Sequence, residues 1–396
     1  MKKIHLGLLP KILLAILLGI LASFVMPAWM IRLFVTFNGF FGNMLSFAVP
    51  LIIVALVTSA IADTESGAGK MLVVTFSLAY ISTITAGFVS YFTSATIFPH
   101  IISSSKMEAV SMAEDALTAY FTIPMPPLMD IMSSLVLSFL LGLGIFYTKA
   151  QVMHQGFTEL KEIISKFISG VIIPLLPLYI FGLFLSLAAS GEAMRVIMVF
   201  IKIIGFIFVL HILWLVFLFV IAGISGKKNP WRLLKCMLPA YLTALATQSS
   251  VATLPVTLRQ AHLLGADEKI ADFVVPLCAN IHLSGSILKI VSCALALMIM
   301  QGHTYSFPLF AGFIFVLAIT VVAAPGVPGG VIMASLSVLS GVLGFTAEDN
   351  ALMISVYIAM DNFGTACNVT GDGALTVITD AIMKRLEKKK TVPVAE

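Results

Sequence analysis

The sequence predicts an all-α polytopic membrane protein, and three observations lead to this fold class. Of the 396 residues, 60% are hydrophobic and 11% are charged, whereas about a quarter of the residues in a soluble domain are charged. Apolar runs of about 20 residues, long enough to cross a bilayer core, recur along the chain. Short runs rich in serine, glycine and proline interrupt the later apolar segments. A lipid bilayer is therefore the expected solvent of most of the chain.

The first part of the chain predicts six membrane spans. They lie near residues 8–29, 38–62, 71–98, 130–148, 161–190 and 194–225. The first is interpreted as a retained helix and not as a signal peptide, because Pro27 and Trp29 do not form a small-residue cleavage site. Basic residues gather in alternate loops and in the tail from Lys384, so the positive-inside rule places both termini in the cytoplasm. We expect a multi-pass protein of the cell inner membrane.

Several function classes are disfavoured by the sequence. Ser249 and Ser250 have neither a nearby base nor a G-x-S-x-G turn, and the sequence contains no phosphate-binding loop. The net charge of +4 acts as a topology signal and not as a nucleic-acid footprint. The four cysteines lie in or beside apolar segments without metal-ligand spacing: Cys236, Cys278, Cys293 and Cys367. We expect no enzyme activity, no cofactor and no nucleic-acid partner.

Two apolar segments after residue 235 are broken near their middles. One turns within Gln248-Ser-Ser-Val-Ala-Thr-Leu-Pro255 and the other within Ala324-Pro-Gly-Val-Pro-Gly-Gly330. Proline removes a backbone donor and glycine permits positive φ, so each segment can fold back as a re-entrant hairpin. An ordinary kinked helix is the alternative for either segment taken alone. Paired broken segments are typical of an inverted repeat around a solute site, which indicates a secondary transporter.

The last apolar segment carries acidic side chains. Asp361 precedes Asn368 by seven residues and Asp372 by eleven, so the three share one face of a helix. We expect this helix to loosen near Gly364 and Gly371. A carboxylate at membrane depth is costly without a cation, so each aspartate needs one. For Asp361, and for Asp372 as well, the alternative is a structural ion pair with Lys289.

These segments resemble the glutamate transporter family, the dicarboxylate/amino acid:cation symporters. Order, spacing and hydropathy fit over essentially the whole chain, with specific matches between about 240 and 375. The chain looks like a divergent bacterial-type member, similar to neutral amino acid carriers. The motifs that carry the resemblance are Thr253-Leu-Pro-Val-Thr257, Pro276-Leu with Ser284-Gly285, Gly326-Val-Pro-Gly329 and Asn368-Val-Thr-Gly-Asp372.

The resemblance implies eight transmembrane helices and two re-entrant hairpins with inverted repeats, in a homotrimer that works as an elevator within membrane lipid. Residues 1–235 would form mostly scaffold and trimerisation helices 1 to 6, with helices 3 and 6 joining the transport domain. Residues 236–396 would form the transport core, and the segment from about 314 to 343 would act as its gate. The elements of the core are hairpin 1 (236–262), helix 7 (266–301), hairpin 2 (307–346) and helix 8 (348–385).

The resemblance also implies a substrate site. Asp361 matches the residue that holds the α-amino group of an amino acid, Thr365 matches one that helps to orient it, and Asn368 matches one on the α-carboxylate side. Ser250 and the backbone of Val251 match positions that receive the α-carboxylate. The other expected substrate-binding residues are Ser249, Ser286, Val327, Gly329 and Gly364.

Two departures from the family pattern indicate the substrate class. Gly364 and Gln248 stand where members with acidic substrates carry arginine. A second substrate carboxylate would be buried without a guanidinium partner, which is costly. Gly364 and Cys367 also add little bulk, so the expected substrate is a neutral amino acid such as alanine, serine, threonine or methionine. A dicarboxylate or an acidic amino acid is the alternative.

The sequence leaves the coupling ion open. His282-Leu-Ser-Gly285 stands where the family carries an Asn-Met-Asp-Gly run that completes sodium sites, and Lys289, seven residues on, shares the His282 helix face. Three alternatives remain: sodium bound through Asn368 and Asp372, proton coupling through His282, or an uncoupled exchanger in which Lys289 or His282 replaces the cation. The expected ion-coupling residues are His282, Ser284, Lys289, Asn368 and Asp372.

Overall fold

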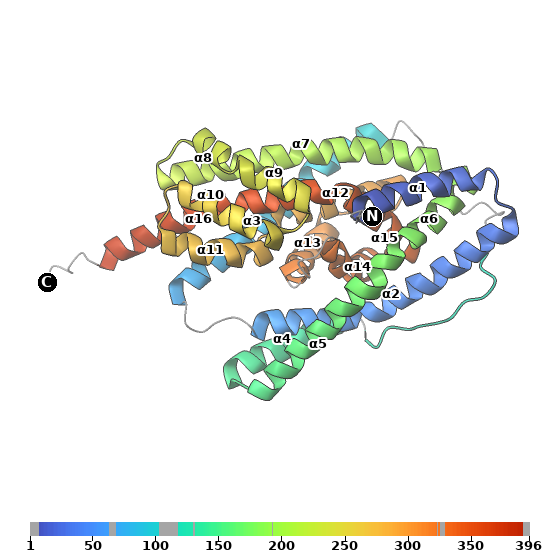
Figure 1. The fold of residues 1–396 in the computed structure, drawn as a ribbon, viewed down its shortest axis with the longest axis horizontal. Helices are drawn as coiled ribbons and strands as arrows, with labels where there is room; N and C mark the ends of the chain where they lie inside the picture. Colours follow the sequence, from blue (N-terminus) through green and yellow to red (C-terminus); the bar gives the residue numbers. More distant parts are fainter. Residues whose placement is uncertain are drawn as a thin grey trace, which may run out of the picture. The chain divides into compact units, whose positions relative to one another are not determined.

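A computed structural model describes residues 8–62, 69–102, 118–129, 131–191, 193–322, 324 and 329–390. All regular secondary structure in these ranges is helical (Figure 1), with sixteen α-helices, one π-helical turn and no strand. The predicted all-α class is therefore confirmed for the described part of the chain.

The helices are described in chain order. The first part contains α1 (Leu8–Ser23), α2 (Ala28–Ala62), α3 (Gly69–Ile102), α4 (Ile131–Thr148), α5 (Gln151–Phe167), the π-turn η1 (Ile168–Ile172), α6 (Ile173–Ala189) and α7 (Ala193–Gly226). The second part contains α8 (Pro230–Cys236), α9 (Leu238–Thr247), α10 (Ser250–Leu263), α11 (Glu268–Ile281), α12 (Ser284–Met300), α13 (Phe307–Val322), α14 (Gly330–Leu343), α15 (Ala347–Ala359) and α16 (Asp361–Lys390).

Five helical segments in the described ranges are long and apolar enough to cross a membrane: Ala28–Ser59, Lys70–Ile102, Gln151–Ala189, Val196–Gly226 and Glu268–Met300. Large apolar side chains such as Leu17, Ile201 and Leu213 are exposed on α1 and α7, as lipid-facing residues are. The Glu268–Met300 segment differs, since nearly all of its most apolar 18-residue stretch is buried within the protein. The polar residues buried in this stretch face protein, the environment that ionisable groups need at membrane depth.

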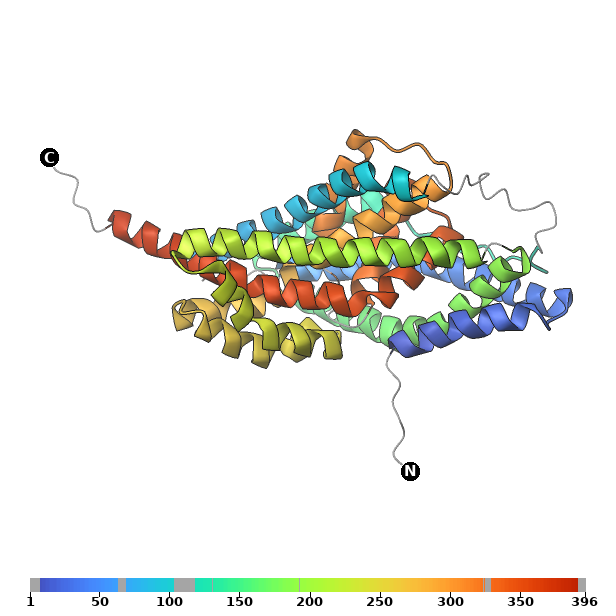
Figure 2. The ribbon, with the colours of Figure 1, turned by 90° about the horizontal axis from the view of Figure 1, so that it is seen from above.

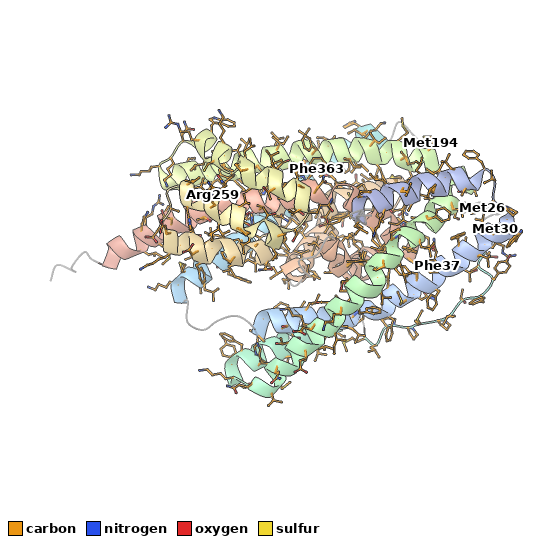
Figure 3. All side chains as sticks on the ribbon, in the orientation of Figure 1. Met26, Met30, Phe37, Met194, Arg259 and Phe363 are labelled. Atoms are coloured by element: carbon orange, nitrogen blue, oxygen red, sulfur yellow. The ribbon has the colours of Figure 1, made fainter. Side chains whose placement is uncertain are left out.

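The predicted boundaries of the first two spans are wrong. The first was expected over 8–29, but α1 ends at Ser23 and α2 begins at Ala28. The chain turns before Pro27, where the Met26 amide donates to the Ala22 carbonyl at 2.8 Å. Met26 and Met30, labelled in Figure 3, flank this proline. Because proline has no amide hydrogen and a fixed φ, it suits the start of a new helix better than the interior of the old one.

The chain divides into two compact units. Unit 1 consists of Met1–Thr64, Tyr91–Gly205 and Ile290–Met360, and unit 2 consists of Glu65–Ser90, Phe206–Lys289 and Asp361–Glu396. One boundary between the units lies between Thr64 and Glu65, and the others fall within α3, α7 and α12 and between α15 and α16. Both units are discontinuous in sequence, so compactness does not follow the expected division at residue 235. The division into scaffold and transport core concerns function and stays a prediction.

Within unit 1, α1 packs against α6, and α2 packs against α4, α5 and α6. The hydroxyl of Tyr179 donates to the Ala347 carbonyl at 2.8 Å, which ties α6 to the start of α15. A capping box between Thr346 and Asp349 begins α15. The helices α13 and α14 of the expected second hairpin contact each other. The turn residues Ala323 and Pro325 to Pro328 lie outside the described residues.

Within unit 2, α16 packs against α9, α10 and α11, which lie along it in Figure 2. The chain turns from α9 into α10 at Gln248, whose φ of 55° is left-handed, and Ser249 then caps α10 through the Ala252 amide. Ala261, Ala271 and Val275 form a buried cluster where α10 meets α11.

Three expectations about the last helices differ from the structure. The segment expected as one helix over 266–301 breaks after Ile281, because the backbone of His282 is extended at φ −98° and ψ 93°. His282 and Lys289 therefore do not share the face of one helix, although the sequence predicted that they would. The segment expected over 348–385 divides between α15 and α16 at Met360. Beyond this break α16 is continuous, so it does not loosen at Gly364 or Gly371.

Candidate functional site

The polar face predicted for the last helix lies on α16 in the interior of the protein. Asp361, Thr365, Asn368 and Asp372 are all buried. Asp361 is the first residue of α16, so its carboxylate lies at the positive end of the helix dipole. The break at Met360 therefore places one carboxylate at a helix N-terminus, where the helix dipole favours negative charge.

Lys289 of α12 pairs with Asp361. Its Nζ lies 3.0 Å from Oδ1 of Asp361, and the lysine is fully buried. The ion pair that the sequence offered as the alternative for Asp361 is thus present. Removing one member of such a buried pair costs about 3–5 kcal/mol, because the other charge stays buried without a partner.

Gly364 receives the side chain of Lys289. A Cβ atom at Gly364 would lie 2.5 Å from Nζ of Lys289 and would also overlap its Cε. We predicted from the sequence that the space beside Gly364 holds a substrate side chain, but in the structure Lys289 fills this space. Cys367 packs closely against Gly285, since a Cβ atom at Gly285 would lie 2.7 Å from the Cβ of Cys367. The space beside Cys367 is thus also filled by protein.

His282 lies between two polar groups. Its Nδ1 is 2.9 Å from Oδ1 of Asp372, and its Nε2 is 2.9 Å from Oγ of Ser82 on α3. All three side chains are buried. Gly371 makes room for the imidazole, because a Cβ atom there would lie 2.7 Å from Cε1 of His282. A glycine of α16 thus receives each of the two basic side chains.

Ser82 could not be predicted from the sequence, because a lone serine in an apolar span matches no motif. A weaker signal is present in α3, where Ser82, Ala86, Ser90 and Ser94 are small and spaced by four residues. Small residues on one helix face allow close helix packing in membranes. The structure shows the consequence within unit 2, where the Ser90 hydroxyl donates to the Leu288 carbonyl at 2.8 Å.

Asn368 fixes the beginning of α12. Its Oδ1 accepts from the Gly285 amide at 2.7 Å, and its Nδ2 donates to Oγ of Ser286 at 3.1 Å. Nε2 of His211 lies 2.8 Å from the Gly285 carbonyl. Gly285 must be glycine for this approach, since a Cβ atom there would also lie 2.7 Å from the Gly364 carbonyl oxygen.

The other expected site residues divide between the two units. Ser249, Ser250 and Val251 form the start of α10, a helix that packs against α16 within unit 2. Gly329 belongs to unit 1, where it begins α14 with a φ of 76° that favours glycine. Val327 lies outside the described residues.

The charged residues of unit 2 are unevenly distributed. Its arginines, Arg232, Arg259 and Arg385, are all exposed, and Figure 3 labels Arg259 on α10. Lys289 is the only buried lysine or arginine among the residues whose burial the structure describes. In the same residues no group of three or more His, Cys, Asp or Glu side chains could hold a metal ion. Two buried oxygens, Oγ of Ser284 and Oδ2 of Asp372, have no hydrogen-bond partner there.

Comparison with known proteins gives matches along nearly the whole chain. A profile of the sodium:dicarboxylate symporter family matches residues 8–382. Excitatory amino acid transporter 3 of Mus musculus is 38% identical over 164 residues, which are 40% of this chain and 30% of the relative. Excitatory amino acid transporter 4 of Mus musculus is 30% identical over 295 residues, 70% of this chain and 50% of the relative. The serine/threonine transporter SstT of Acinetobacter baumannii is 24% identical over 395 residues, 95% of this chain and 97% of the relative.

The helical fold, its apolar segments and these matches indicate a multi-pass membrane protein. The chain belongs to the sodium:dicarboxylate symporter family, whose members are transporters and not enzymes. It spans 30% of excitatory amino acid transporter 3 and half of transporter 4. The resemblance seen in the sequence motifs is thereby confirmed at the level of the family.

Proposed function

We propose that this protein is a secondary active transporter that imports small neutral amino acids, with Asp361 holding the α-amino group of the substrate. The observation that carries the proposal is the buried polar face of α16, where Asp361, Thr365 and Asn368 lie in an interior without arginine among the described residues. A carboxylate binds an ammonium group, whereas a second substrate carboxylate needs a guanidinium or an equivalent cation.

The expected substrates follow from the charges of the site. Lys289 is the one buried ammonium group in the described part of the chain, and Asp361 already engages it. An acidic side chain would therefore compete with Asp361 for Lys289. The name of the SstT relative favours serine and threonine among neutral amino acids. Alanine and methionine remain candidates on size alone.

The proposal includes the elevator architecture of eight transmembrane helices, two re-entrant hairpins and a homotrimer in the inner membrane, with both termini cytoplasmic. The set of helices that forms unit 2 supports the elevator architecture, because parts of α3 and α7 belong to the same compact unit as α9, α10, α11 and α16. These parts would join the transport domain, and residues 314–343 would form its gate.

The proposed coupling ion is sodium or a proton. The oxygen atoms that support sodium are Oδ2 of Asp372 and Oγ of Ser284, which are buried without a partner in the described residues. Sodium, a hard cation, prefers such oxygen ligands. The imidazole of His282 at Oδ1 of Asp372 supports the proton instead, because imidazole is a group that can accept and donate a proton.

A second candidate function is uncoupled amino acid exchange. Each buried aspartate of the site already has a nitrogen partner, Lys289 for Asp361 and His282 for Asp372. Built-in partners of this kind would remove the need for a coupling cation. Exchange without concentration against a gradient would distinguish this candidate from symport.

Binding to the purified full-length protein tests the proposal. Calorimetric titration with serine, threonine, alanine, methionine and aspartate should give saturable binding of one or more neutral amino acids and none of aspartate. Asp361→Asn should abolish serine binding. The matched control is Asp272→Asn, which removes an exposed carboxylate that pairs with His262 on the surface. Tighter binding of aspartate than of every neutral amino acid would refute the proposed substrate class.

A further inference from the structure

Lys289 and the proposed substrate both present an ammonium group to the carboxylate of Asp361. The proposed function assigns Asp361 to the ammonium group of the substrate, and Nζ of Lys289 lies 3.0 Å from that carboxylate. The ammonium of a lysine and the α-ammonium of an amino acid are the same chemical group. Both are therefore ligands for one carboxylate in a buried site.

We propose that Lys289 is a tethered stand-in for the substrate's amino group, and that an amino acid binds by ion-pair exchange. The substrate ammonium takes Asp361, and the released ammonium of Lys289 takes the substrate carboxylate. This inference rests on the proposed function, since it takes Asp361 as the amino-group site. It makes Lys289 a residue that determines substrate class.

After the exchange, every charge of Lys289, Asp361 and the ligand has an opposite partner only if the ligand is a zwitterion. Before binding, Lys289 and Asp361 sum to zero, and both are buried. A neutral amino acid also carries one charge of each sign, so both protein charges and both substrate charges are paired afterwards. An amine without a carboxylate takes Asp361 from Lys289 and supplies no carboxylate in return. A carboxylate without an amine finds Lys289 already engaged by Asp361. An unpaired buried charge is strongly unfavourable, so the pair selects zwitterions without any arginine.

In the proposed exchange the backbone of Lys289 stays fixed and its ammonium moves. The beginning of α12 is fixed to α16, because Asn368 binds Gly285 and Ser286. The far end of the lysine lies directly over Gly364, where a Cβ atom would overlap its Cε and Nζ. A lysine ammonium sits on a flexible four-carbon stem. The proposed exchange turns the ammonium from Asp361 toward the ligand by rotation of this stem, while α12 stays in place.

Two variants, each of which removes one charge of the ion pair, should change the preference of the site from zwitterions to singly charged ligands. In Lys289→Met the site keeps only the negative charge of Asp361, so a cation without a carboxylate becomes the balanced ligand. In Asp361→Asn the site keeps only the positive charge of Lys289, so a carboxylate without an amine becomes the balanced ligand. The probes are serine, serinamide and 3-hydroxypropanoate, which share the hydroxymethyl group and differ in the charged groups.

The experiment measures calorimetric binding of the three probes to the full-length protein in detergent. We expect wild type to prefer serine to both analogues, Lys289→Met to prefer serinamide, and Asp361→Asn to prefer 3-hydroxypropanoate, each by about tenfold or more. Lys269→Met, which removes a lysine near the start of α11, is the control that should keep the wild-type order. A purely structural ion pair predicts no gain of serinamide binding.

Each outcome decides the matter. If Lys289→Met binds serine in preference to serinamide, the stand-in role is refuted while amino acid transport is untouched. If Lys289→Met does not fold, wild type and Asp361→Asn still decide, because serinamide binding to wild type as tightly as serine would contradict the exchange. If wild type binds no neutral amino acid, the proposed function fails and the inference fails with it.

Discussion

The imidazole of His282 and the carboxylate of Asp372 lie 2.9 Å apart in the buried interior of unit 2. This contact joins the residue after α11 to the middle of α16, across 90 positions of sequence. It occupies Oδ1 of Asp372 and leaves Oδ2 without a partner in the described residues. The relationship bears directly on which cation the site can accept.

Replacement of His282 by asparagine tests the sodium hypothesis. His282→Asn removes the imidazole from Oδ1 of Asp372 and supplies an amide oxygen, a ligand that sodium prefers. We expect sodium to stimulate serine uptake severalfold in the variant and less in wild type. Uptake into proteoliposomes at constant pH over a series of sodium concentrations measures this. A sodium response identical to that of wild type would show that the imidazole does not exclude the ion.

Replacement of Gly364 by alanine should disrupt the Lys289 pair. The new Cβ would overlap Cε and Nζ of Lys289, and moving the ammonium away breaks its contact with Asp361. We expect a loss of about 1–3 kcal/mol in stability, as for other overpacked interiors. The control is Gly312→Ala on α13, where a Cβ meets nothing within 4 Å. The midpoint temperature of thermal unfolding in detergent should be lower for Gly364→Ala than for wild type, and unchanged for Gly312→Ala. Equal midpoints would argue against tight packing of Lys289.

Removal of the Ser82 hydroxyl should weaken the position of His282. In Ser82→Ala, Nε2 of His282 loses its partner at 2.9 Å. A buried polar atom left without a partner costs about 1–3 kcal/mol. The control on the same helix is Thr85→Ala, which removes a hydroxyl that donates to the Ile81 carbonyl of its own helix. A lowered unfolding temperature for Ser82→Ala relative to Thr85→Ala is the expected result, and no difference would contradict a structural role of this contact.

The sequence predicted the helical class and the polar face of α16, because composition and helix periodicity are local properties. It did not predict which residues would meet. Ser82 is one small polar residue in a long apolar span, and only the three-dimensional packing of α3 against His282 distinguishes it. The break at His282 was missed as well, since no proline or glycine occupies that position.

The sequence also assigned Gly364 a different physical role. A missing side chain was interpreted as room for the substrate, but the structure fills that space with Lys289 from another helix. The pairing of Lys289 with Asp361 was predicted only as an alternative, because a sequence shows that a buried charge needs a partner without showing which partner it takes. The substrate roles of Asp361, Thr365 and Asn368 stay predictions.

The central claim is that the chain carries small neutral amino acids. The most direct measurement is uptake of labelled serine and aspartate into proteoliposomes under an inward sodium gradient, an inward proton gradient or neither. The account predicts accumulation of serine above its external concentration under one of the gradients, with aspartate uptake at the level of empty liposomes. Accumulation of aspartate in place of serine would contradict the claim.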